Sequence, residues 1–400
     1  MSTKTSTDRI CITGMGMVTS LGLDFVNGCA AARAGLIRLN NLNVLNFIGD
    51  ELWGGEPVTA HMVPNIAEGF SGFAKVLLLG RHALNDLFAR RKMSDVELNR
   101  TGIYINLSDQ YFLDAHVAFE NLERENLFRD FSYEERKRAE DDFHEDQALP
   151  SIRWKEECRN LIPRLLESCD LALKPPHQSI FFGNHVGIIS AIQNGIKNIR
   201  LGKFDRCIVG GIDCCTEPRF LVSAAAAGVL KTTANPIGFI PGEAAGFILL
   251  EKIEDAKARG IEAASLLGSL TTSIDKTNRL SDHPPNGIAL ALSIDTVLSA
   301  LNYPTQEVGL VIGDLNGDSY RAMDWGHAMV RLESKYGIGD LPLWLPAMAF
   351  GETGAATGAL SICTGTWALK RKYAPKGAIL VWLSSDNGAR AAACLQPVRD

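Results

Sequence analysis

Apolar and polar positions along the chain follow two alternating patterns. Short apolar runs, typical of buried strands, occur at residues 9–14 and 102–107. Longer segments with apolar residues every three or four positions, typical of amphipathic helices, occur at residues 24–33 and 73–89. Strands that alternate with helices in this way favour an α/β fold with mainly parallel strand pairing.

Two segments repeat one plan of strand, helix and strand, at residues 179–182, 187–200 and 206–209 and again at residues 343–347, 354–370 and 378–383. Each is a β-α-β unit, so the sequence predicts an internally duplicated fold in which the loops after equivalent strands face each other across a pseudo-twofold axis. His185 and Glu352 lie in those loops. We therefore expect Glu352 in the first turn of a helix, facing His185.

Between residues 109 and 174 the pattern becomes highly charged, with EERKRAEDDFHEDQ at residues 134–147. Such a composition cannot bury a core, so we expect exposed helices that form an insertion layered on the fold. On this basis the chain divides into an N-terminal half, residues 1–255, which carries the insertion, and a C-terminal half, residues 256–400.

The composition does not indicate a function, but it argues against a nucleic-acid partner and a membrane span. The 400 residues are 46% hydrophobic and 22% charged, as in many globular proteins. A net charge of −6 provides no basic field for a phosphate backbone, which argues against nucleic acid as a partner. No apolar stretch approaches the roughly 20 residues of a membrane helix, and the polar start MSTKTSTDRI lacks a signal-peptide segment. We expect a cytoplasmic protein without a membrane span.

Candidate metal, redox and cofactor motifs are weak. The nine cysteines form no Cys-x-x-Cys pair and lie mostly in apolar patterns, so we interpret them as buried reduced thiols. Cys214 and Cys215 could act as nucleophiles, but their apolar surroundings favour a core role. In a dinucleotide fingerprint a third glycine would follow Gly14 and Gly16, but Thr19 takes its place. We predict no cofactor and no metal site.

Four segments, in order along the chain, resemble the β-ketoacyl-acyl-carrier-protein synthases of the thiolase superfamily. They are TGMGMVTSLG at 13–22, KFDRCIVGGID at 203–213, GFIPGEAAGFILLEK at 238–252 and HPPNGIALALSIDTVLSALN at 283–302. The resemblance spans most of the chain except about 109–174. It implies a five-layered α-β-α-β-α thiolase fold with two pseudo-duplicated halves, and a dimer formed through the N-terminal half.

The resemblance also indicates where that family carries a nucleophilic cysteine and two catalytic histidines. The corresponding residues here are His185, Asn316 and Glu352. Imidazole at position 185 cannot form the acyl thioester, and a carboxylate at position 352 would repel the enolate that a histidine stabilises. The resemblance therefore implies a divergent branch, and we expect no catalytic residues at these positions.

The substrate arm of the family is altered as well. The hydroxyl residues that hold pantetheine in the family correspond to Asp318, Ser319 and Tyr320, and an acid that the family carries further along corresponds to Asp324. These four residues are our candidates for lining a pocket next to the three family catalytic positions. An acidic residue among them would oppose an anionic substrate arm.

Three interpretations of His185, Asn316 and Glu352 stay open. They can merely satisfy the ends of strands and helices. They can form an acid–base pair with Asn316 as oxyanion donor, suited to hydrolysis or proton transfer. They can also border a retained pocket that binds an acyl or other ligand without turnover.

The resemblance implies a catalytically degenerate homologue, a pseudoenzyme that acts as a non-condensing binding or scaffold subunit. Expected partners are a second copy or, as for chain-length factors, a ketosynthase-like subunit, with an acyl carrier protein or a secretion-system protein as further candidates. NGDSYRAMDWG and GETGAATG together resemble a branch of 3-oxoacyl synthases associated with type VI secretion gene clusters. The alternative is an active acyltransferase or 3-oxoacyl-acyl-carrier-protein synthase, of fatty acid or polyketide type, with a remodelled site.

Overall fold

The computed structural model describes residues 9–42, 57–127, 149–171, 175–281, 283–301, 307–375 and 377–398. Ten strands form one large sheet: β1 (Ile10–Val18), β4 (Thr101–Leu107), β5 (Gln178–Phe182), β6 (Arg206–Cys214), β7 (Glu243–Lys252), β8 (Ser265–Ile274), β9 (Val308–Ile312), β10 (Leu343–Trp344), β11 (Ala378–Ser384) and β12 (Ala389–Gln396). Two further strands, β2 (Asn40–Leu42) and β3 (Val58–Ala60), form a separate small sheet.

The strand order of the large sheet shows the internal duplication. Outward from its middle the sheet runs β1-β7-β6-β4-β5 on one side and β8-β12-β11-β9-β10 on the other. Each strand of one half therefore has a counterpart at the same place in the other. Strands β4, β5 and β6 pair in parallel, as do β9, β10 and β11, and the remaining pairs are antiparallel. The antiparallel pairing of β1 with β8 joins the two halves.

Helices cover the two sheet halves on both faces. They are α1 (Phe25–Arg33), α2 (Gly72–Arg90), α3 (Asp95–Asn99), α4 (Tyr111–Leu127), α6 (Pro150–Glu157), α7 (Leu161–Ser168), α8 (Asn184–Arg200), α9 (Pro218–Ala226), α10 (Ile253–Ala258), α11 (Ile288–Ser299), α12 (Ser319–Tyr336), α13 (Pro346–Phe350) and α14 (Thr357–Lys370). Short 3₁₀ helices are η3 (Cys158–Asn160), η4 (Ile338–Asp340) and η5 (Gly354–Ala356).

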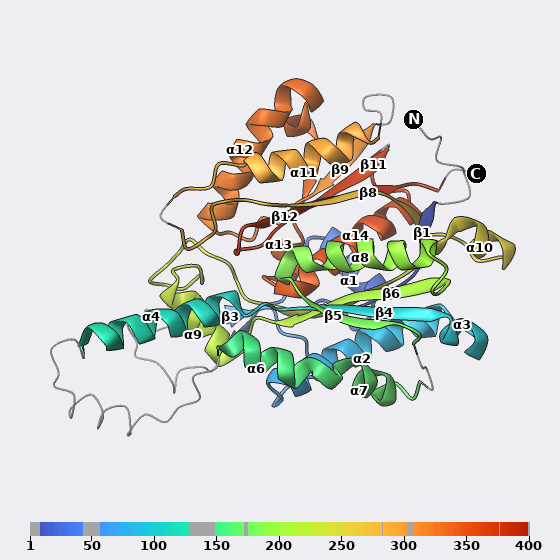
Figure 1. Ribbon diagram of the computed structural model, residues 1–400. Helices are drawn as coiled ribbons and strands as arrows, with labels where there is room; N and C mark the ends of the chain where they lie inside the picture. The colour runs from blue at the N-terminus through green and yellow to red at the C-terminus, as the bar shows by residue number, and fades with distance from the viewer. Residues whose placement is uncertain are drawn as a thin grey trace.

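Five layers follow from this arrangement (Figure 1). Helices α8 and α14 lie between the two sheet halves, α2 and α7 lie outside the N-terminal half, and α11 and α12 lie outside the C-terminal half. Sequence patterns explain the difference between inner and outer helices. The outer helix α2 buries Val76, Leu79, Ala83 and Leu87, at helical spacing, whereas nearly every residue of the central helix α14 is buried. The fold is the five-layered thiolase architecture with two pseudo-duplicated halves.

The structure differs from the predicted elements at one strand. The strand expected at 343–347 is limited to Leu343–Trp344, and Pro346 begins α13. Proline has no backbone N–H to donate to a sheet, and its fixed φ fits the first position of a helix. The predicted division of the chain at residue 255 falls within α10, which joins β7 to β8, and stays a prediction.

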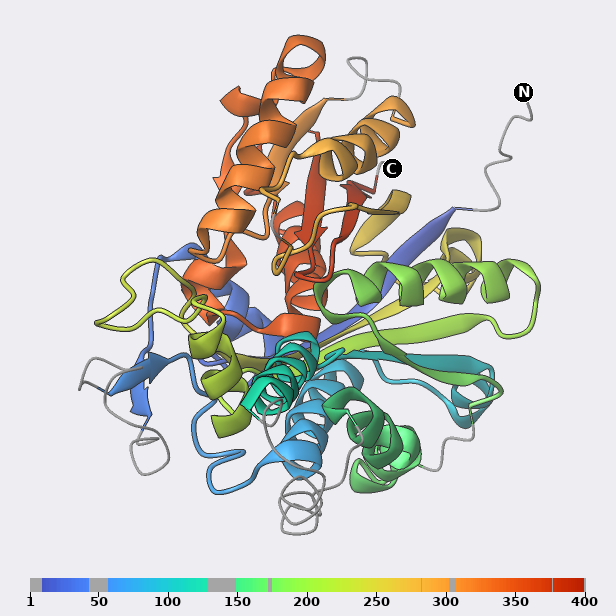
Figure 2. The same cartoon turned by 60° about the vertical axis from the view of Figure 1, so that its left-hand side comes forward.

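The described parts of the charged segment are helical. Helices α4, α6 and α7 lie on the N-terminal half, where α4 contacts α6 and α9, and α7 contacts α2. Figures 1 and 2 both show α6 and α7 on the side of the sheet where α2 lies. Residues 134–147, predicted as exposed helix, lie outside the described residues. Among the helices that the structure describes, none has the length and apolar character that a membrane crossing requires.

Candidate functional site

His185 lies at the start of the central helix α8, one tight turn after strand β5. Asn184, the first residue of the helix, has a φ of 48°, a left-handed conformation that asparagine tolerates better than most residues. Asn106 of β4 holds this turn by donating a hydrogen bond from Nδ2 to the Asn184 carbonyl, at 2.6 Å. The turn thereby points His185 into the interior, where its side chain is only 2% exposed.

Glu352 lies at the equivalent place of the C-terminal half, between α13 and η5. Its backbone N–H donates to the Ile240 carbonyl at 2.7 Å, and its carbonyl accepts from the Gly242 N–H at 2.8 Å. Its Oε1 accepts the N–H of Gly354 at 2.8 Å. Glu352 thus precedes a 3₁₀ turn by two residues, whereas we expected it inside the first turn of a helix.

His185, Asn316 and Glu352, the three residues predicted to occupy the family catalytic positions, meet between the halves. His185 Nε2 donates to Glu352 Oε1 at 2.6 Å, and Asn316 Nδ2 donates to Glu352 Oε2 at 2.6 Å. The side-chain oxygen of Asn316 accepts the backbone N–H of Asp318 at 3.0 Å, which fixes the amide orientation. His185 therefore faces Glu352, as predicted, and both carboxylate oxygens of Glu352 are used within the protein.

A buried arginine that sequence reasoning missed completes this centre. Arg321 of α12 is 2% exposed, and its Nη1 lies 3.3 Å from Glu352 Oε2 and 3.2 Å from Asp314 Oδ1. Its Nη2 donates to Asp386 Oδ2 at 3.0 Å. The same two nitrogens lie 3.3 and 3.4 Å from the ring nitrogens of His185, so the guanidinium lies alongside the imidazole. We call the side chains of His185, Asp314, Arg321, Glu352 and Asp386 the ion-pair centre.

The charges of this centre follow from its burial and its ion pairs. Burial and Arg321 act to lower the pKa of His185, but Glu352 and Asp314 outweigh them, so that pKa is raised. Burial acts to raise the pKa of Glu352, but His185 and Arg321 hold it well below its usual range. These shifts favour an imidazolium beside a carboxylate. An imidazolium has no lone pair with which to accept a proton, so the raised pKa disfavours His185 as a general base.

A buried carboxylate of the N-terminal half, that of Asp213, also binds the 3₁₀ helix η5 that follows Glu352. Asp213, at the end of β6, accepts the N–H of Ala355 and the N–H of Cys214, each at 2.8 Å. Burial raises the pKa of Asp213 to about 6. Because Ala355 follows Gly354, which donates to Glu352, Asp213 and Glu352 together fix η5.

Little free space remains at the ion-pair centre. The cavity beside it has a volume of about 10 Å³, and its lining includes His185, Glu352 and the aromatic side chains of Phe112, Phe220 and Phe239. This is about the volume that one water molecule needs. A substrate could reach His185 only if neighbouring side chains moved.

Two of the four pocket candidates are used in contacts at the start of α12. Asp318 is buried and forms an ion pair with Arg279, with an Nε to Oδ2 distance of 3.2 Å. Tyr320 is buried too, and the Arg279 guanidinium lies 5.8 Å from the centre of its ring. Asp318 borders the ion-pair centre through its hydrogen bond with Asn316.

The other two candidates lie apart. Ser319 is exposed, and Asp324 is fully buried in an ion pair with Arg390 at 2.7 Å. Neither these two residues nor Asp318 and Tyr320 line the small cavity described above. A role for the four residues in a ligand pocket stays a prediction.

Sequence reasoning missed Arg321, Asp314 and Asp386 for a physical reason. Arg321 stands in the polar segment NGDSYRAMDWG, where an arginine is typical of an exposed helix face. Charge balance could have indicated a buried arginine, because a carboxylate buried at position 352 requires a nearby cation in addition to a histidine.

The cysteines offer no activated nucleophile. All nine are free thiols, and all except Cys169 are buried. Burial raises the pKa of both Cys214 and Cys215 well above the ordinary thiol value, which disfavours the reactive thiolate. Among the described residues, no group of three or more histidine, cysteine or acidic side chains could hold a metal ion.

Comparisons with known proteins agree with this architecture. The model of the β-ketoacyl synthase N-terminal domain matches residues 187–256. The tetracenomycin polyketide synthase ketoacyl synthase beta subunit of Streptomyces glaucescens is 23% identical over 211 residues, 50% of each chain. The chloroplastic 3-oxoacyl-[acyl-carrier-protein] synthase II of Arabidopsis thaliana is 24% identical over 329 residues, 76% of this chain and 55% of that one. The chain is therefore similar in sequence to the β-ketoacyl synthases.

Solved structures of β-ketoacyl synthases and related proteins share the whole fold. The ishigamide ketosynthase/chain length factor superposes with a TM-score of 0.72 at 17% identity, covering 98% of this chain and 100% of that one. A β-ketoacyl synthase from Burkholderia phymatum gives a TM-score of 0.69 at 17% identity, with the same coverage. This β-ketoacyl synthase homologue spans about half the length, or less, of the first curated relatives that it matches.

Proposed function

We propose that this β-ketoacyl synthase homologue is a non-condensing pseudoenzyme that acts as a binding or scaffold subunit. The observation that carries the proposal is the ion-pair centre, which includes two of the residues predicted to occupy the family catalytic positions. His185, Arg321 and Glu352 satisfy one another's charges there, beside a cavity of about 10 Å³. The centre has the features of a structural junction between the two halves.

The chemistry of condensation fits this centre poorly. Acyl transfer needs a nucleophile, and the Ser385 hydroxyl close to the turn is engaged with the backbone of Val186 at 3.1 Å and of Gly183 at 3.4 Å. Condensation also needs donors aimed at a developing oxyanion. Asn316 and Arg321 donate to carboxylates instead. A growing negative charge would therefore face Glu352.

Relatives suggest what a non-condensing subunit does. Three similar proteins are a ketoacyl synthase beta subunit, a ketosynthase/chain length factor, and a ketosynthase in complex with its acyl-carrier protein. By analogy, the partner here is a ketosynthase-like subunit or a second copy of this chain, in the cytoplasm. An acyl carrier protein or a secretion-system protein is a further candidate partner.

Intact-protein mass spectrometry after incubation with acyl- and malonyl-carrier proteins tests the proposal. We expect no acyl adduct and no 3-oxoacyl product, together with co-elution of the chain with a ketosynthase-like subunit, or with itself, in size-exclusion chromatography. A stable acyl adduct or a condensation product would overturn the proposal in favour of the active acyltransferase alternative.

A further inference from the structure

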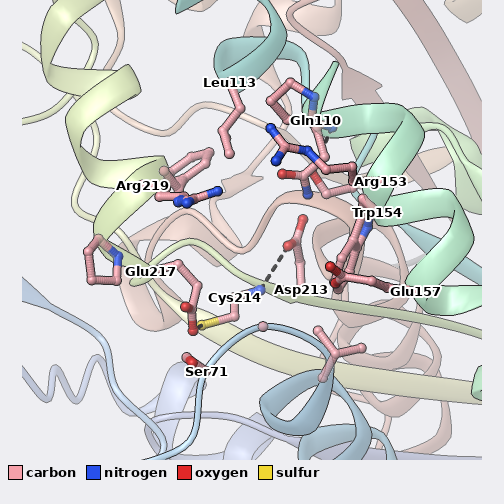
Figure 3. A pocket seen from close by; sticks show the side chains of 16 residues that line it. Ser71, Gln110, Leu113, Arg153, Trp154, Glu157, Asp213, Cys214, Glu217 and Arg219 are labelled. Atoms are coloured by element: carbon pink, nitrogen blue, oxygen red, sulfur yellow. Dashed lines mark hydrogen bonds between the residues drawn. The ribbon is translucent and has the colours of Figure 1, made fainter. Parts of the chain in front are cut away.

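A second cavity lies next to the ion-pair centre, in the N-terminal half (Figure 3). It has a volume of about 700 Å³, and its lining comes largely from helices α2, α4, α6 and α9. Ser108, Asp213 and Phe220 line both this cavity and the small one beside His185. We call it the side cavity. Its volume is in the range of about 300–1,000 Å³ that is usual for sites of small organic ligands.

Two arginines point into the side cavity from different helices. Figure 3 shows the guanidinium groups of Arg153, from α6, and Arg219, from α9, directed toward its interior. Neither side chain has an ion-pair partner among the residues that the structure describes. Arginine forms paired hydrogen bonds with carboxylates, so two such side chains facing one cavity are suited to an anion.

The backbone adds to this positive character. Gly72, Pro150 and Pro218 are the first residues of α2, α6 and α9, and all three line the side cavity. No side chain caps the start of α2 or α9 with a hydrogen bond, whereas at α6 the Asp114 carboxylate accepts the N–H of Ser151 at 2.9 Å. The partial positive charges of the α2 and α9 helix ends therefore act in the same direction as the two arginines.

Acidic side chains at the side cavity do not cancel this effect. The Asp213 carboxylate is occupied by the N–H groups of Cys214 and Ala355. Glu217 lies 3.6 Å from the Cys214 thiol, and Glu157 is an exposed residue at the end of α6. No ion pair joins Glu217 or Glu157 to either arginine within the described chain.

The remaining lining is largely apolar, with Val76, Leu113, Trp154 and Phe220 among its side chains. Leu113, in the first turn of α4, lies on the same side of the cavity as Arg219 and Arg153 (Figure 3). An occupant that satisfies both parts of this wall has a charged group and an apolar body.

We propose that the side cavity binds an amphipathic organic carboxylate, with its charged group between Arg153 and Arg219 and its apolar body against Leu113, Trp154 and Phe220. Arg153 and Trp154 belong to the 109–174 segment, where the sequence does not resemble the synthases. The site depends neither on the loss of condensation nor on a partner subunit, so it goes beyond the proposed function.

Calorimetric titration of the full chain with octanoate and with 1-octanol tests the site. Octanoate should bind, and octanol, which has the same apolar body, should bind at least about tenfold more weakly because it lacks the charge. R153Q and R219Q should each weaken octanoate binding about tenfold or more. The matched control is R159Q, which removes an exposed arginine of the neighbouring η3 that does not line the side cavity.

A further variant tests the site in case the arginine variants do not fold. Leu113→Glu places a like charge in the cavity, at a helix start where an acid is tolerated, so its melting temperature should stay near that of the wild type while octanoate binding is lost. Octanoate binding unchanged in R153Q and R219Q, octanol binding as tightly as octanoate, or no octanoate binding at millimolar concentration would each overturn the proposal.

Discussion

The two neighbouring cavities share part of their walls but use charge in opposite ways. At the ion-pair centre, Arg321 contacts three carboxylates, and about 10 Å³ of space remains. In the side cavity of about 700 Å³, Arg153 and Arg219 have no acidic partner among the described residues. One region holds charges that the protein has neutralised, and the other presents charges that water solvates.

This difference predicts that the two regions contribute to different properties, the ion-pair centre to folding stability and the side cavity to ligand binding. A buried charge that loses its partner is costly, because neither water nor another group replaces the lost interaction. An arginine that borders an open cavity keeps its hydration, so a ligand needs to displace only water. We therefore expect changes at the ion-pair centre to act mainly on folding, and changes in the side cavity to act mainly on ligand binding.

The largest expected effect comes from Arg321→Met. This change leaves Asp314, Asp386 and Glu352 without their shared cation, and it should lower the free energy of unfolding by about 3–5 kcal/mol. Urea unfolding followed by circular dichroism measures it. Arg321→Lys keeps one charge and should lose less, whereas Arg159→Met on the surface should change little. An Arg321→Met variant as stable as the wild type would contradict the central role of this arginine.

His185→Cys should affect both stability and chemistry. It removes one partner of Glu352, which should lower the free energy of unfolding by about 1–3 kcal/mol. The new cysteine should not create a condensing enzyme, because the loss of one oxyanion donor costs about 10²–10³ in rate even without an opposing carboxylate. The measurement is 3-oxoacyl product from acyl- and malonyl-carrier proteins. Robust turnover would show that Asn316 and Glu352 are compatible with condensation.

The pH dependence of stability should reflect the same ion pair. The pKa of Glu352 is lowered by folding, so its contribution is present above the unfolded value of about 4.3 and is lost as the pH falls. The pKa of His185 is raised, so its contribution is present below the unfolded value of about 6.5 and is lost as the pH rises through the folded value. Both contributions are therefore present between about pH 4.3 and 6.5.

The contribution of Asp213 to stability changes with pH in the opposite direction to that of Glu352. Its folded pKa of about 6 exceeds the unfolded value of about 3.9, so protonation of Asp213 adds stability as the pH falls through that window. Each pH unit between a folded and an unfolded pKa corresponds to about 1.4 kcal/mol. Urea titrations from acid to alkaline pH should show the alkaline loss disappear in His185→Gln, and the gain near pH 5 disappear in Asp213→Asn. Identical profiles for wild type and His185→Gln would refute the imidazolium assignment.

The sequence predicts the fold and one part of the ion-pair centre. Its repeated strand–helix–strand plan locates His185 and Glu352 at equivalent turns, and the structure brings them within 2.6 Å. The plan works because helices α8 and α14 each follow a strand in a local unit, which leaves periodic signals along the chain. The strand predicted at 343–347 is limited to Leu343–Trp344, because the last two residues of the predicted range, Pro346 and Ala347, begin a helix.

The rest of the centre could not be predicted in the same way. Asp314, Arg321 and Asp386 lie on different elements, and each stands in a polar segment that is compatible with exposure. Their burial depends on how the carboxyl ends of β9 and β11 meet α12, which no local pattern records. The side cavity was missed for the same reason, because its walls come from elements far apart in the chain.

The smallest expected effect, and the sharpest contrast between the two regions, comes from Glu217→Gln in the side cavity. Glu217 is half-buried just before α9 and has no ion pair with Arg153 or Arg219, so the change should alter the free energy of unfolding by no more than about 0.5 kcal/mol. Loss of the like charge should tighten octanoate binding by less than about 1 kcal/mol, because water screens charges in an open cavity.

The same chemical change at Glu352 should behave differently. Glu352→Gln removes a buried partner of both His185 and Arg321, so unfolding and calorimetric titration of the two variants give a direct comparison. We expect Glu352→Gln to lower stability by about 3–5 kcal/mol and to leave octanoate binding by the folded protein unchanged. If Glu217→Gln proved as destabilising as Glu352→Gln, the charges of the side cavity would be structural as well, and the separation between folding and binding would fail.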